Sequence, residues 1–451
     1  MKAIEGVIPE GYNGIKGFFE SIKKSQDSQL DWYYETWKKY GDYAKIIGMP
    51  NYDVFIISDP DGVEHILKTN HQNYKKPDFF NNSVGLLAGK GLIVNEGEQW
   101  LKNRRIMQPL FRKDSLNSFF DIMKACTLEL ISKLEQKTEA FDIVKEMYDI
   151  VIKIAGLTLL SSDLSSEASE LGKNYREAFD FLSYKLRNPL SLPTWFPTEK
   201  NHRFHDAKKF IDNIISNIIE EHKNNNRKEV KDIISLLLNA KDPQTGEKLT
   251  EKEVKDEAIT LLTAGHETTA CALSWLWYLL GLNTDKQEKL YQEIGNLDIL
   301  NCNLEDIQKI KYSKMVFDET LRLYPPAYSM PREAINDDII KGYLIPKKSV
   351  IIVSCYTVHR REDLWEKPEE FYPEHFIEEA VEKRHKFAFF PFSGGPRVCI
   401  GANFAYMETQ IIISMLAKKF RFELEPNQKI EADTTFSLKP KNPIYVKAYK
   451  R

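Results

Sequence analysis

Apolar residues recur at three- and four-residue intervals along most of this chain, which is the spacing of one face of an α-helix. Such patterns predict helices over residues 28–39 and 313–324, the second stopped by Pro325 and Pro326. The clearest apolar stripe consists of Ala207, Phe210, Ile211, Ile214, Ile215, Ile218 and Ile219. The sequence therefore predicts a protein that is mainly α.

Short apolar runs rich in Ile, Val and Phe predict a smaller β component. The runs at 44–49 and 54–58 form an expected strand pair, and 339–353 and 443–448 contain further short strands. Residues 434–438 are expected to form a hairpin tip. The predicted fold class is mainly α with small β-sheets, with a β-containing N-terminal part and a helix-rich remainder.

One predicted helix is unusually long. Thr250 followed by Glu253 forms a capping box, and the apolar pattern continues to Gly281, the expected stop. Beyond its first turns this helix is apolar almost all round, which is typical of a core helix or a membrane span. His266 and Glu267 near its middle favour the core helix, because an ionisable residue at the centre of a bilayer costs at least ~2.5 kcal/mol.

Composition narrows the class of protein. With 451 residues, 42% of them hydrophobic, the chain can bury a large core, and residues 1–451 are expected to form one domain. Lys and Arg total 63 against 66 Asp and Glu, so no basic surface indicates a nucleic-acid partner. The polar residues 223–231 are interpreted as a solvated surface loop.

The cysteines and the N-terminus bear on location. Five cysteines, odd in number and scattered, favour a reducing compartment over a disulfide framework, and hence the cytoplasm. The first ten residues contain no long apolar run, so neither a signal peptide nor a membrane anchor is expected.

Residues 392–401 are the stretch whose residue types most clearly indicate a binding site, with one cysteine, one arginine and three glycines. A helical pattern follows at once, so Cys399 lies just before a helix N-terminus, where the helix dipole and free N–H groups favour a thiolate, which is a metal ligand. Glycines allow a flat ligand to approach the backbone closely. Arg397 can pair with a carboxylate on such a ligand.

The order of Phe392, Gly395, Arg397, Cys399 and Gly401 gives the pattern F-x-x-G-x-R-x-C-x-G. This resembles the haem-binding loop of the cytochrome P-450 family, the haem-thiolate monooxygenases, and the chain looks like the soluble prokaryotic type over roughly its last four hundred residues. The resemblance implies the cytochrome P-450 fold, with many helices around a haem and small β-sheets. It also implies haem b (iron protoporphyrin IX) as cofactor and Cys399 as the iron ligand.

The motif A-G-H-E-T-T lies in the middle of the long helix. Gly265 costs about 1 kcal/mol there relative to alanine, which a ligand packed on the helix would explain; a local kink without chemistry is the alternative. The motif resembles the family's oxygen-binding motif. That implies that Ala264 and Gly265 contact the cofactor, that Thr268 hydrogen-bonds the oxygen species, and that Glu267 with water supplies protons. His266 receives no role.

Four residues would hold the haem carboxylates. Trp100 and Arg104 share one face of a predicted helix, a spacing that alone indicates only an amphipathic helix. Beside the cysteine loop, the pair resembles the family's haem-propionate clamp. By the same resemblance, Arg332 and Arg397 are further propionate binders.

Glu319 and Arg322 can pair at a spacing of three, and most such pairs are surface salt bridges. Directly before two prolines, the pattern E-x-x-R resembles the family's core ion pair. The family adds an arginine from a later P-x-R-F segment, where this chain has His375. Histidine can still hydrogen-bond, but its charge near neutral pH is not assured.

Residues 75–95 are apolar but not periodic, which predicts a packed loop or a pocket wall. In the resembled family this loop contributes to the substrate pocket. The residues expected to surround an apolar substrate are Phe79, Phe80, Leu86, Leu87, Phe179, Phe181, Tyr328, Ser329, Met330 and Phe436.

The resemblance as a whole implies a monooxygenase that inserts one atom of O₂ into a lipophilic small molecule of the fatty acid, terpenoid, steroid or polyketide type. No flavin or iron–sulfur domain is visible, so a ferredoxin or flavodoxin with an NAD(P)H-dependent reductase is expected to supply electrons to a monomeric enzyme. A docking face for it, or ordinary solvated charge, would comprise Lys102, Arg105, Arg112 and Lys113.

Two alternative functions stay open at this point. The first is an oxygen-independent haem-thiolate peroxygenase or isomerase, a group that typically lacks the acid–threonine pair present at Glu267 and Thr268. The second is a non-catalytic haem-thiolate binding protein, which an additional output domain would favour.

Overall fold

The computed structural model describes residues 6–50, 52–188, 191–224 and 233–451, so most of the loop predicted at 223–231 lies outside the described residues. The chain divides into two compact units. One comprises Met1–Asp78 with Asp318–Cys399, and the other Phe79–Phe317 with Ile400–Arg451. The expected fold class, mainly α with small β-sheets, is confirmed.

The first unit is built on a five-stranded sheet with strand order β1-β2-β8-β5-β3. Strands β2 and β8 are parallel, and the other neighbours are antiparallel. The strands are β1 (Tyr43–Met49), β2 (Tyr52–Ile57), β3 (Tyr74–Lys75), β5 (Ser329–Ala334) and β8 (Val350–Ser354), and a separate ribbon consists of β6 (Asp338–Ile340) and β7 (Tyr343–Ile345).

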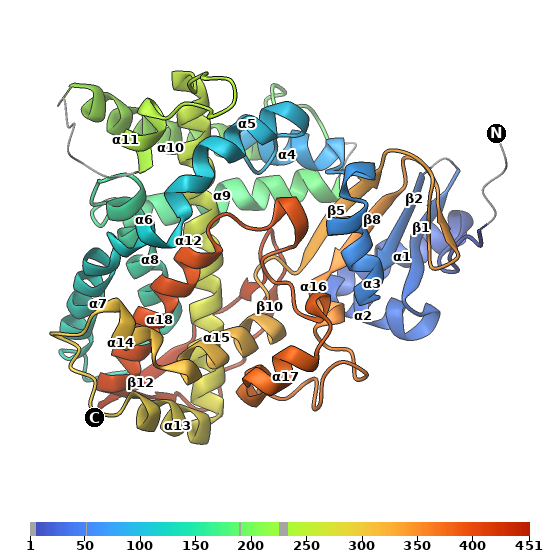
Figure 1. Ribbon diagram of the computed structural model, residues 1–451. Helices are drawn as coiled ribbons and strands as arrows, with labels where there is room; N and C mark the ends of the chain where they lie inside the picture. The colour runs from blue at the N-terminus through green and yellow to red at the C-terminus, as the bar shows by residue number, and fades with distance from the viewer. Residues whose placement is uncertain (1–5, 51, 189–190, 225–232) are drawn as a thin grey trace. The chain divides into compact units, whose positions relative to one another are not determined.

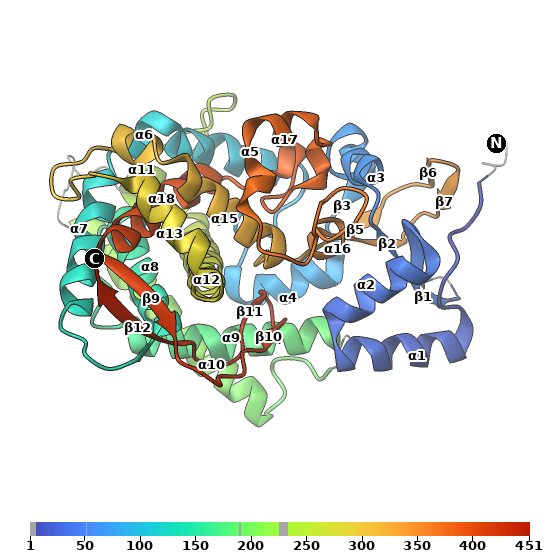
Figure 2. The same ribbon diagram turned by 90° about the horizontal axis from the view of Figure 1, so that it is seen from below.

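Helices α1 (Gly14–Asp27) and α2 (Gln29–Tyr40) pack beside β1 (Figure 2). Asp59 followed by Pro60 predicts a helix start, with an N-cap and then proline at the first helical position. The structure confirms it, because the Asp59 carboxylate accepts a hydrogen bond from the Gly62 amide at 3.1 Å and Pro60 occupies the first turn. The remaining helical segments of this unit are α3 (Pro60–Glu64), a π-helix (His65–Thr69), α16 (Cys355–Val358) and α17 (Glu378–Lys383).

The second unit is largely helical. Its helices are α4 (Asp78–Ala88), α5 (Gly97–Met107), α6 (Lys113–Asn117), α7 (Phe120–Leu134), α8 (Ile143–Leu159), α9 (Ala168–Arg187), α10 (Glu199–Asn224), α11 (Ile233–Asn239), α12 (Glu251–Leu282), α13 (Thr284–Ile294), α14 (Leu304–Gln308) and α18 (Ala402–Lys419), while α15 (Lys311–Leu323) extends across the boundary between the units. A three-stranded sheet, β4-β12-β9, and a hairpin, β10-β11, complete it; the strands are β4 (Phe141–Asp142), β9 (Phe420–Leu424), β10 (Ala432–Asp433), β11 (Lys439–Pro440) and β12 (Tyr445–Lys450).

The long helix α12 is the axis of the second unit, and α8 packs along it (Figure 1). Its 32 residues give a length of about 48 Å. The capping box is present: Thr250 Oγ1 accepts from the Glu253 amide at 3.2 Å, and Glu253 Oε2 accepts from the Thr250 amide at 2.7 Å. Because this helix is buried along most of its length, it determines the positions of the elements that pack against it.

Two sequence predictions about helices are wrong. Gly281 does not stop α12, which continues to Leu282; a Cβ at Gly281 would lie 2.7 Å from the Leu424 side chain, so glycine is needed for close packing on β9. Residues 78–88 are not a loop but helix α4, because contacts of Val84 and Ala88 with Val94 give the segment a buried face that its own periodicity did not reveal.

No helix in the described part of the chain combines the length and apolarity that a bilayer crossing requires.

In the first unit, Glu319 and Arg322 are fully buried and form a bidentate pair, with Nε–Oε2 at 2.8 Å and Nη2–Oε1 at 2.7 Å. The guanidinium also donates to the carbonyl oxygens of His359, Pro368 and Glu370 at 2.6–2.9 Å. The pair therefore fastens α15 to the irregular segment that leads to the cysteine loop.

His375 joins this network. Its Nδ1 lies 3.2 Å from both carboxylate oxygens of Glu319, and its Nε2 contacts the Glu366 carbonyl. Both partners are acceptors, so the ring satisfies both only when it carries two N–H groups and a positive charge, as arginine would. The histidine thus occupies the third position of the buried network.

We expect His375→Ala to lower the free energy of unfolding by about 2–3 kcal/mol, because it leaves buried carboxylate oxygens with fewer donors. His375→Gln keeps an amide donor and should lose less. Urea unfolding monitored by circular dichroism measures both. Equal midpoints for the wild type, the alanine variant and the glutamine variant would contradict a structural role for this side chain.

Candidate functional site

The cysteine loop lies in the first unit and leads directly into α18. The Cys399 amide donates to the Phe392 carbonyl at 2.9 Å, which closes the loop ahead of the helix N-cap at Gly401. None of the five cysteines forms a disulfide, and Cys399 alone among them is exposed. The loop therefore presents one thiol outward while the other four serve as buried packing groups.

The glycines of this loop have different purposes. A Cβ at Gly395, which has φ of +63°, would lie 1.9 Å from the Leu67 carbonyl oxygen, and a Cβ at Gly394 would lie 2.4 Å from the Phe387 ring. A Cβ at Gly401 would meet nothing within 4 Å. Gly394 and Gly395 are therefore required by packing within the unit. Gly401 is the one of the three that packing does not require, so the expectation that a glycine lets a ligand approach the backbone applies to Gly401 alone.

The first unit also carries two of the expected carboxylate binders. Arg332 lies on β5, opposite Ile351 of β8, and is buried, with Nη1 donating to its neighbouring Pro331 carbonyl at 2.9 Å. Arg397 is half-buried in the short 3₁₀ turn that precedes Cys399. Both guanidiniums thus come from rigid backbone segments, one strand and one tight turn.

The other two expected binders, Trp100 and Arg104, are half-buried and lie one turn apart on α5 in the second unit. Sequence reasoning missed what holds α5 in place. Asn103 donates to Glu257 Oε1 of α12 at 2.6 Å, and Glu257 Oε2 accepts from the Leu92 amide at 2.9 Å. This contact could have been suspected from the sequence, because polar residues recur at a spacing of four on both predicted helices.

Helix α12 has one open face in its middle. Ala264 and Thr268 are exposed and Gly265 is half-buried, on a helix that is otherwise buried along most of its length. A Cβ at Gly265 would meet only Leu159, at 3.9 Å, so protein packing does not demand this glycine. Thr268 Oγ1 donates to the Ala264 carbonyl at 2.7 Å. This face of small residues is free of protein packing and suits a flat ligand.

Glu267 points away from that face and is buried at 4% exposure. Its Oε1 accepts from Ser437 Oγ at 2.7 Å and from Lys439 Nζ at 3.4 Å, and its Oε2 accepts from Tyr148 Oη at 3.1 Å. Burial lowers the pKa of Lys439 and the Glu267 carboxylate raises it, with a net rise. Burial also raises the pKa of Tyr148 far above its ordinary value, so this hydroxyl stays a donor.

His266, for which no role is expected, is also buried. Its ring packs edge-on against Tyr148 at 5.3 Å between centroids, and burial lowers the pKa of the imidazole. A neutral aromatic ring here fills space beside the Glu267 hydrogen bonds.

Several of the expected substrate residues gather within the second unit. Phe80 and Phe436 pack against the buried cluster of Val84, Ala88 and Val94, and Phe436 stacks on Phe179 with centroids 4.7 Å apart. Leu87 is buried and Phe79 and Leu86 are half-buried on α4. Phe181 instead stacks on Phe204 of α10, which turns it away from this group.

Residues 328–330, which are expected to face the substrate, lie in the first unit. Tyr328 is buried there, and its hydroxyl donates to Gln29 Oε1 at 3.1 Å. Met330 packs against the core of the same unit, and Ser329 is half-buried at the start of β5. None of these three side chains is fully exposed.

The four basic residues expected either to form a docking face or to be ordinary solvated charge differ in their surroundings. Arg105 forms two hydrogen bonds to Asp242, at 2.8 and 2.6 Å, and Lys102 lies 3.1 Å from Glu247. Arg112 is exposed, and the Lys113 side chain lies outside the described part. Two of the four cations are therefore neutralised within the chain.

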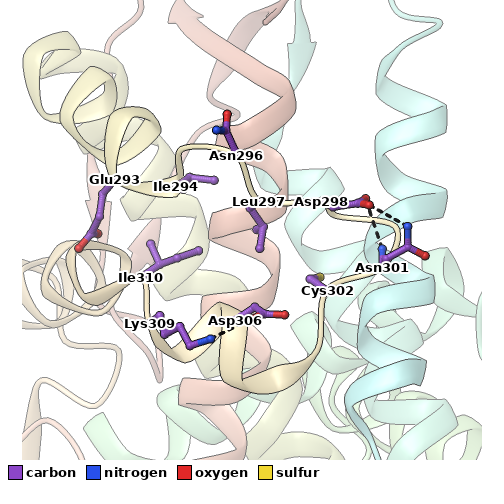
Figure 3. Close-up of a pocket in the computed structure, with 10 residues that line it drawn as sticks. All are labelled: Glu293, Ile294, Asn296, Leu297, Asp298, Asn301, Cys302, Asp306, Lys309 and Ile310. Atoms are coloured by element: carbon purple, nitrogen blue, oxygen red, sulfur yellow. Dashed lines mark hydrogen bonds and ion pairs between the residues drawn. The ribbon is translucent and has the colours of Figure 1, made fainter.

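A surface hollow of about 340 Å³, lined by the end of α13 and by the following segment that contains α14, includes none of the expected site residues (Figure 3). Its polar groups are satisfied locally, since Asp298 accepts from Asn301 at 2.7 Å and Asp306 pairs with Lys309 at 3.1 Å. Nothing in this hollow points to a ligand.

Comparison with known proteins agrees with the motifs. The cytochrome P450 family model matches residues 10–448. Cytochrome P450 4V2 of Mus musculus is 30% identical over 87% of this chain and 79% of its own, and cyclooctatin synthase of Streptomyces melanosporofaciens is 28% identical over 85% and 84%. Putative cytochrome P450 132 of Mycobacterium bovis is 26% identical over 86% of each chain.

The chain belongs to the cytochrome P450 family. Membership makes it a haem-thiolate monooxygenase in general terms, an oxidoreductase that binds haem b through a cysteine thiolate and uses O₂, a lipophilic substrate and redox partners. The residues present fit that cofactor, because the first unit exposes the thiol of Cys399 and α12 has an open face of small residues at which protein packing does not require Gly265.

The pH dependence of stability tests the link between α5 and α12. Burial raises the pKa of Glu257 to about 7, against which the Leu92 amide and Asn103 act in the opposite direction. Between about pH 4.5 and 7 the unfolded chain releases this proton while the folded chain keeps it, so stability falls as pH rises through that window.

We therefore expect Glu257→Gln to reduce the loss of stability between pH 5 and 7.5 by roughly 3 kcal/mol. Urea unfolding at both pH values measures this difference. Glu98→Gln, at an exposed position on α5, is the matched control and should leave the loss unchanged. An identical pH dependence in wild type and Glu257→Gln would show that the carboxyl group is ionised in the folded protein.

Proposed function

We propose that this protein inserts one atom of O₂ into a lipophilic small molecule, with Thr268 and Glu267 directing protons and with electrons supplied by separate proteins. The observation that carries the proposal is the middle of α12. There an exposed threonine and an exposed alanine lie beside a buried carboxylate that three donors hold.

Cys399 would be the iron ligand, and Arg332, Arg397, Trp100 and Arg104 would hold the haem carboxylates. When bound, haem supplies the iron at which O₂ is reduced, and a thiolate ligand favours cleavage of the O–O bond. Four cationic or N–H donors suit two carboxylates, since charge-assisted hydrogen bonds are the stronger kind.

Thr268 and Glu267 would divide the proton handling. The Thr268 hydroxyl donates to a carbonyl of its own helix, which leaves its oxygen lone pairs available to accept a hydrogen bond from a water on the open face. Glu267, one residue earlier and on the buried side, is a carboxylate that can take up a proton and pass it on to such a water. The pair thus joins an exposed acceptor to a buried proton carrier.

The substrate class rests on apolar side chains. Phe80, Phe436 and Phe179 belong to one aromatic and aliphatic group in the second unit, which favours fatty acids, terpenoids, steroids or polyketides. A ferredoxin or flavodoxin with an NAD(P)H-dependent reductase is the proposed electron source. The absence of a disulfide among the five cysteines supports a reducing, cytoplasmic location.

Spectroscopy tests the ligand and the substrate class together. The protein reduced under CO should show the strongly red-shifted Soret band that reports a thiolate ligand, and Cys399→His should move the band to the position seen with a neutral ligand. Titration with lauric acid, geraniol and progesterone should shift the Soret band of the oxidised protein for at least one of them. A wild-type band at the neutral-ligand position would refute the proposal.

Thr268→Ala should leave NAD(P)H consumption running while product per NAD(P)H falls by at least about tenfold and peroxide rises, because the hydroxyl that orders the proton-donating water is lost. Thr268→Ser keeps the hydroxyl and serves as the matched control. Product and peroxide are quantified against NAD(P)H oxidised. Unchanged yield in the alanine variant would remove Thr268 from the proposed mechanism.

A further inference from the structure

The hydrogen bonds of Glu267 come largely from one loop, the tip that joins β10 to β11. We propose that Ser437 and Lys439 are positioning residues that hold the Glu267 carboxylate away from the open face of α12. The contacts of Phe436 with apolar side chains keep this clamp closed. The proposal rests on the proton-supplying role of Glu267 given above.

The clamp is specific in its geometry. Ser437 lies in the bend at the tip and Lys439 begins β11, and the side chains of both reach Oε1 of Glu267. Ser437 is buried, Lys439 is 14% exposed and Glu267 is nearly fully buried, so solvent screens the ion pair little. A charged side chain enclosed this way is held more firmly than a surface pair.

Two further hydrogen bonds hold the tip loop in place. Trp275 of α12 donates to the Leu438 carbonyl at 3.2 Å, and Arg187 at the end of α9 donates to Thr434 Oγ1 at 3.2 Å. Between these anchors Phe436 has φ of +65°, a conformation that costs a non-glycine residue energy and persists only where its surroundings enforce it.

What enforces this conformation is apolar packing. The Phe436 ring stacks on Phe179 and packs against the Val84, Ala88 and Val94 cluster, alongside Phe80. These are the side chains proposed to surround the substrate. An apolar molecule that displaces the Phe436 ring removes the support of the strained residue directly beside Ser437, and the clamp then opens.

Opening would matter because Glu267 and Thr268 lie on different sides of α12. Successive helical residues are about 100° apart, and Thr268 is exposed while Glu267 is buried. A carboxylate held by Ser437, Lys439 and Tyr148 cannot turn toward the open face without giving up those bonds. The loop thus couples apolar contacts at Phe436 to the freedom of the proton-supplying group.

Hydrogen exchange in the substrate-free haem protein tests the clamp without turnover. Ser437→Ala and Lys439→Met should each raise the exchange rate of the 434–439 amides about tenfold, the effect of losing one hydrogen bond to a charged group. Phe436→Ala should do the same from the apolar side. Ser437→Thr should restore slow exchange, and Ser274→Ala, a buried serine of α12 that bonds only its own helix, is the matched control. Unchanged exchange in the Ser437, Lys439 and Phe436 variants would overturn the proposal.

A double-variant experiment shows whether Ser437 acts through Glu267. Ser437→Ala should change product per NAD(P)H several-fold with little effect on KM, and it should have no further effect in a Glu267→Gln background. Additive effects would show that Ser437 acts by another route and would overturn the positioning role. If Glu267→Gln alone leaves product per NAD(P)H intact, the proton role in the proposed function fails, while the exchange experiment still judges the clamp.

Discussion

The burial of α12 is the constraint on which the second unit depends. A helix enclosed on nearly all sides must supply a partner for every polar group it carries, because an unpaired buried charge costs several kcal/mol. The partners of Glu257 come from the segment before α5 and from α5 itself, and those of Glu267 come from α8 and the C-terminal hairpin. Segments far apart in sequence are thus fixed by two carboxylates of one helix.

The first unit uses a carboxylate in the same way. Glu319 accepts from Arg322, from the Tyr372 amide at 2.8 Å and from His375, so one buried acidic group organises the long irregular segment before the cysteine loop. Irregular backbone lacks the repeated hydrogen bonds of helices and sheets, so it needs such anchors to hold one conformation. A loop that presents a thiol at a defined place depends on this.

Local signals in the sequence were enough for features whose partners are close in the chain. The capping box of Thr250 and Glu253 and the N-cap at Asp59 involve atoms within a few residues, so residue type and spacing predicted both. Gly281 was misassigned because the side chain that excludes a Cβ there is Leu424, far along the chain. Helix α4 was missed because its buried face is defined by packing rather than by its own periodicity.

The same distinction between partners close in the chain and distant partners applies to the candidate site. The motif around Cys399 and the acid–threonine pair could be found from residue order, but the partners of Glu267 could not, because Tyr148 lies 119 residues away and Ser437 170 residues away. Even inside the motif, order did not reveal purpose: Gly395 is required by the backbone at Leu67, whereas Gly401 borders open space. Residues that define a family by sequence therefore include both those that meet the ligand and those that shape the loop presenting it, and only contacts distinguish the two.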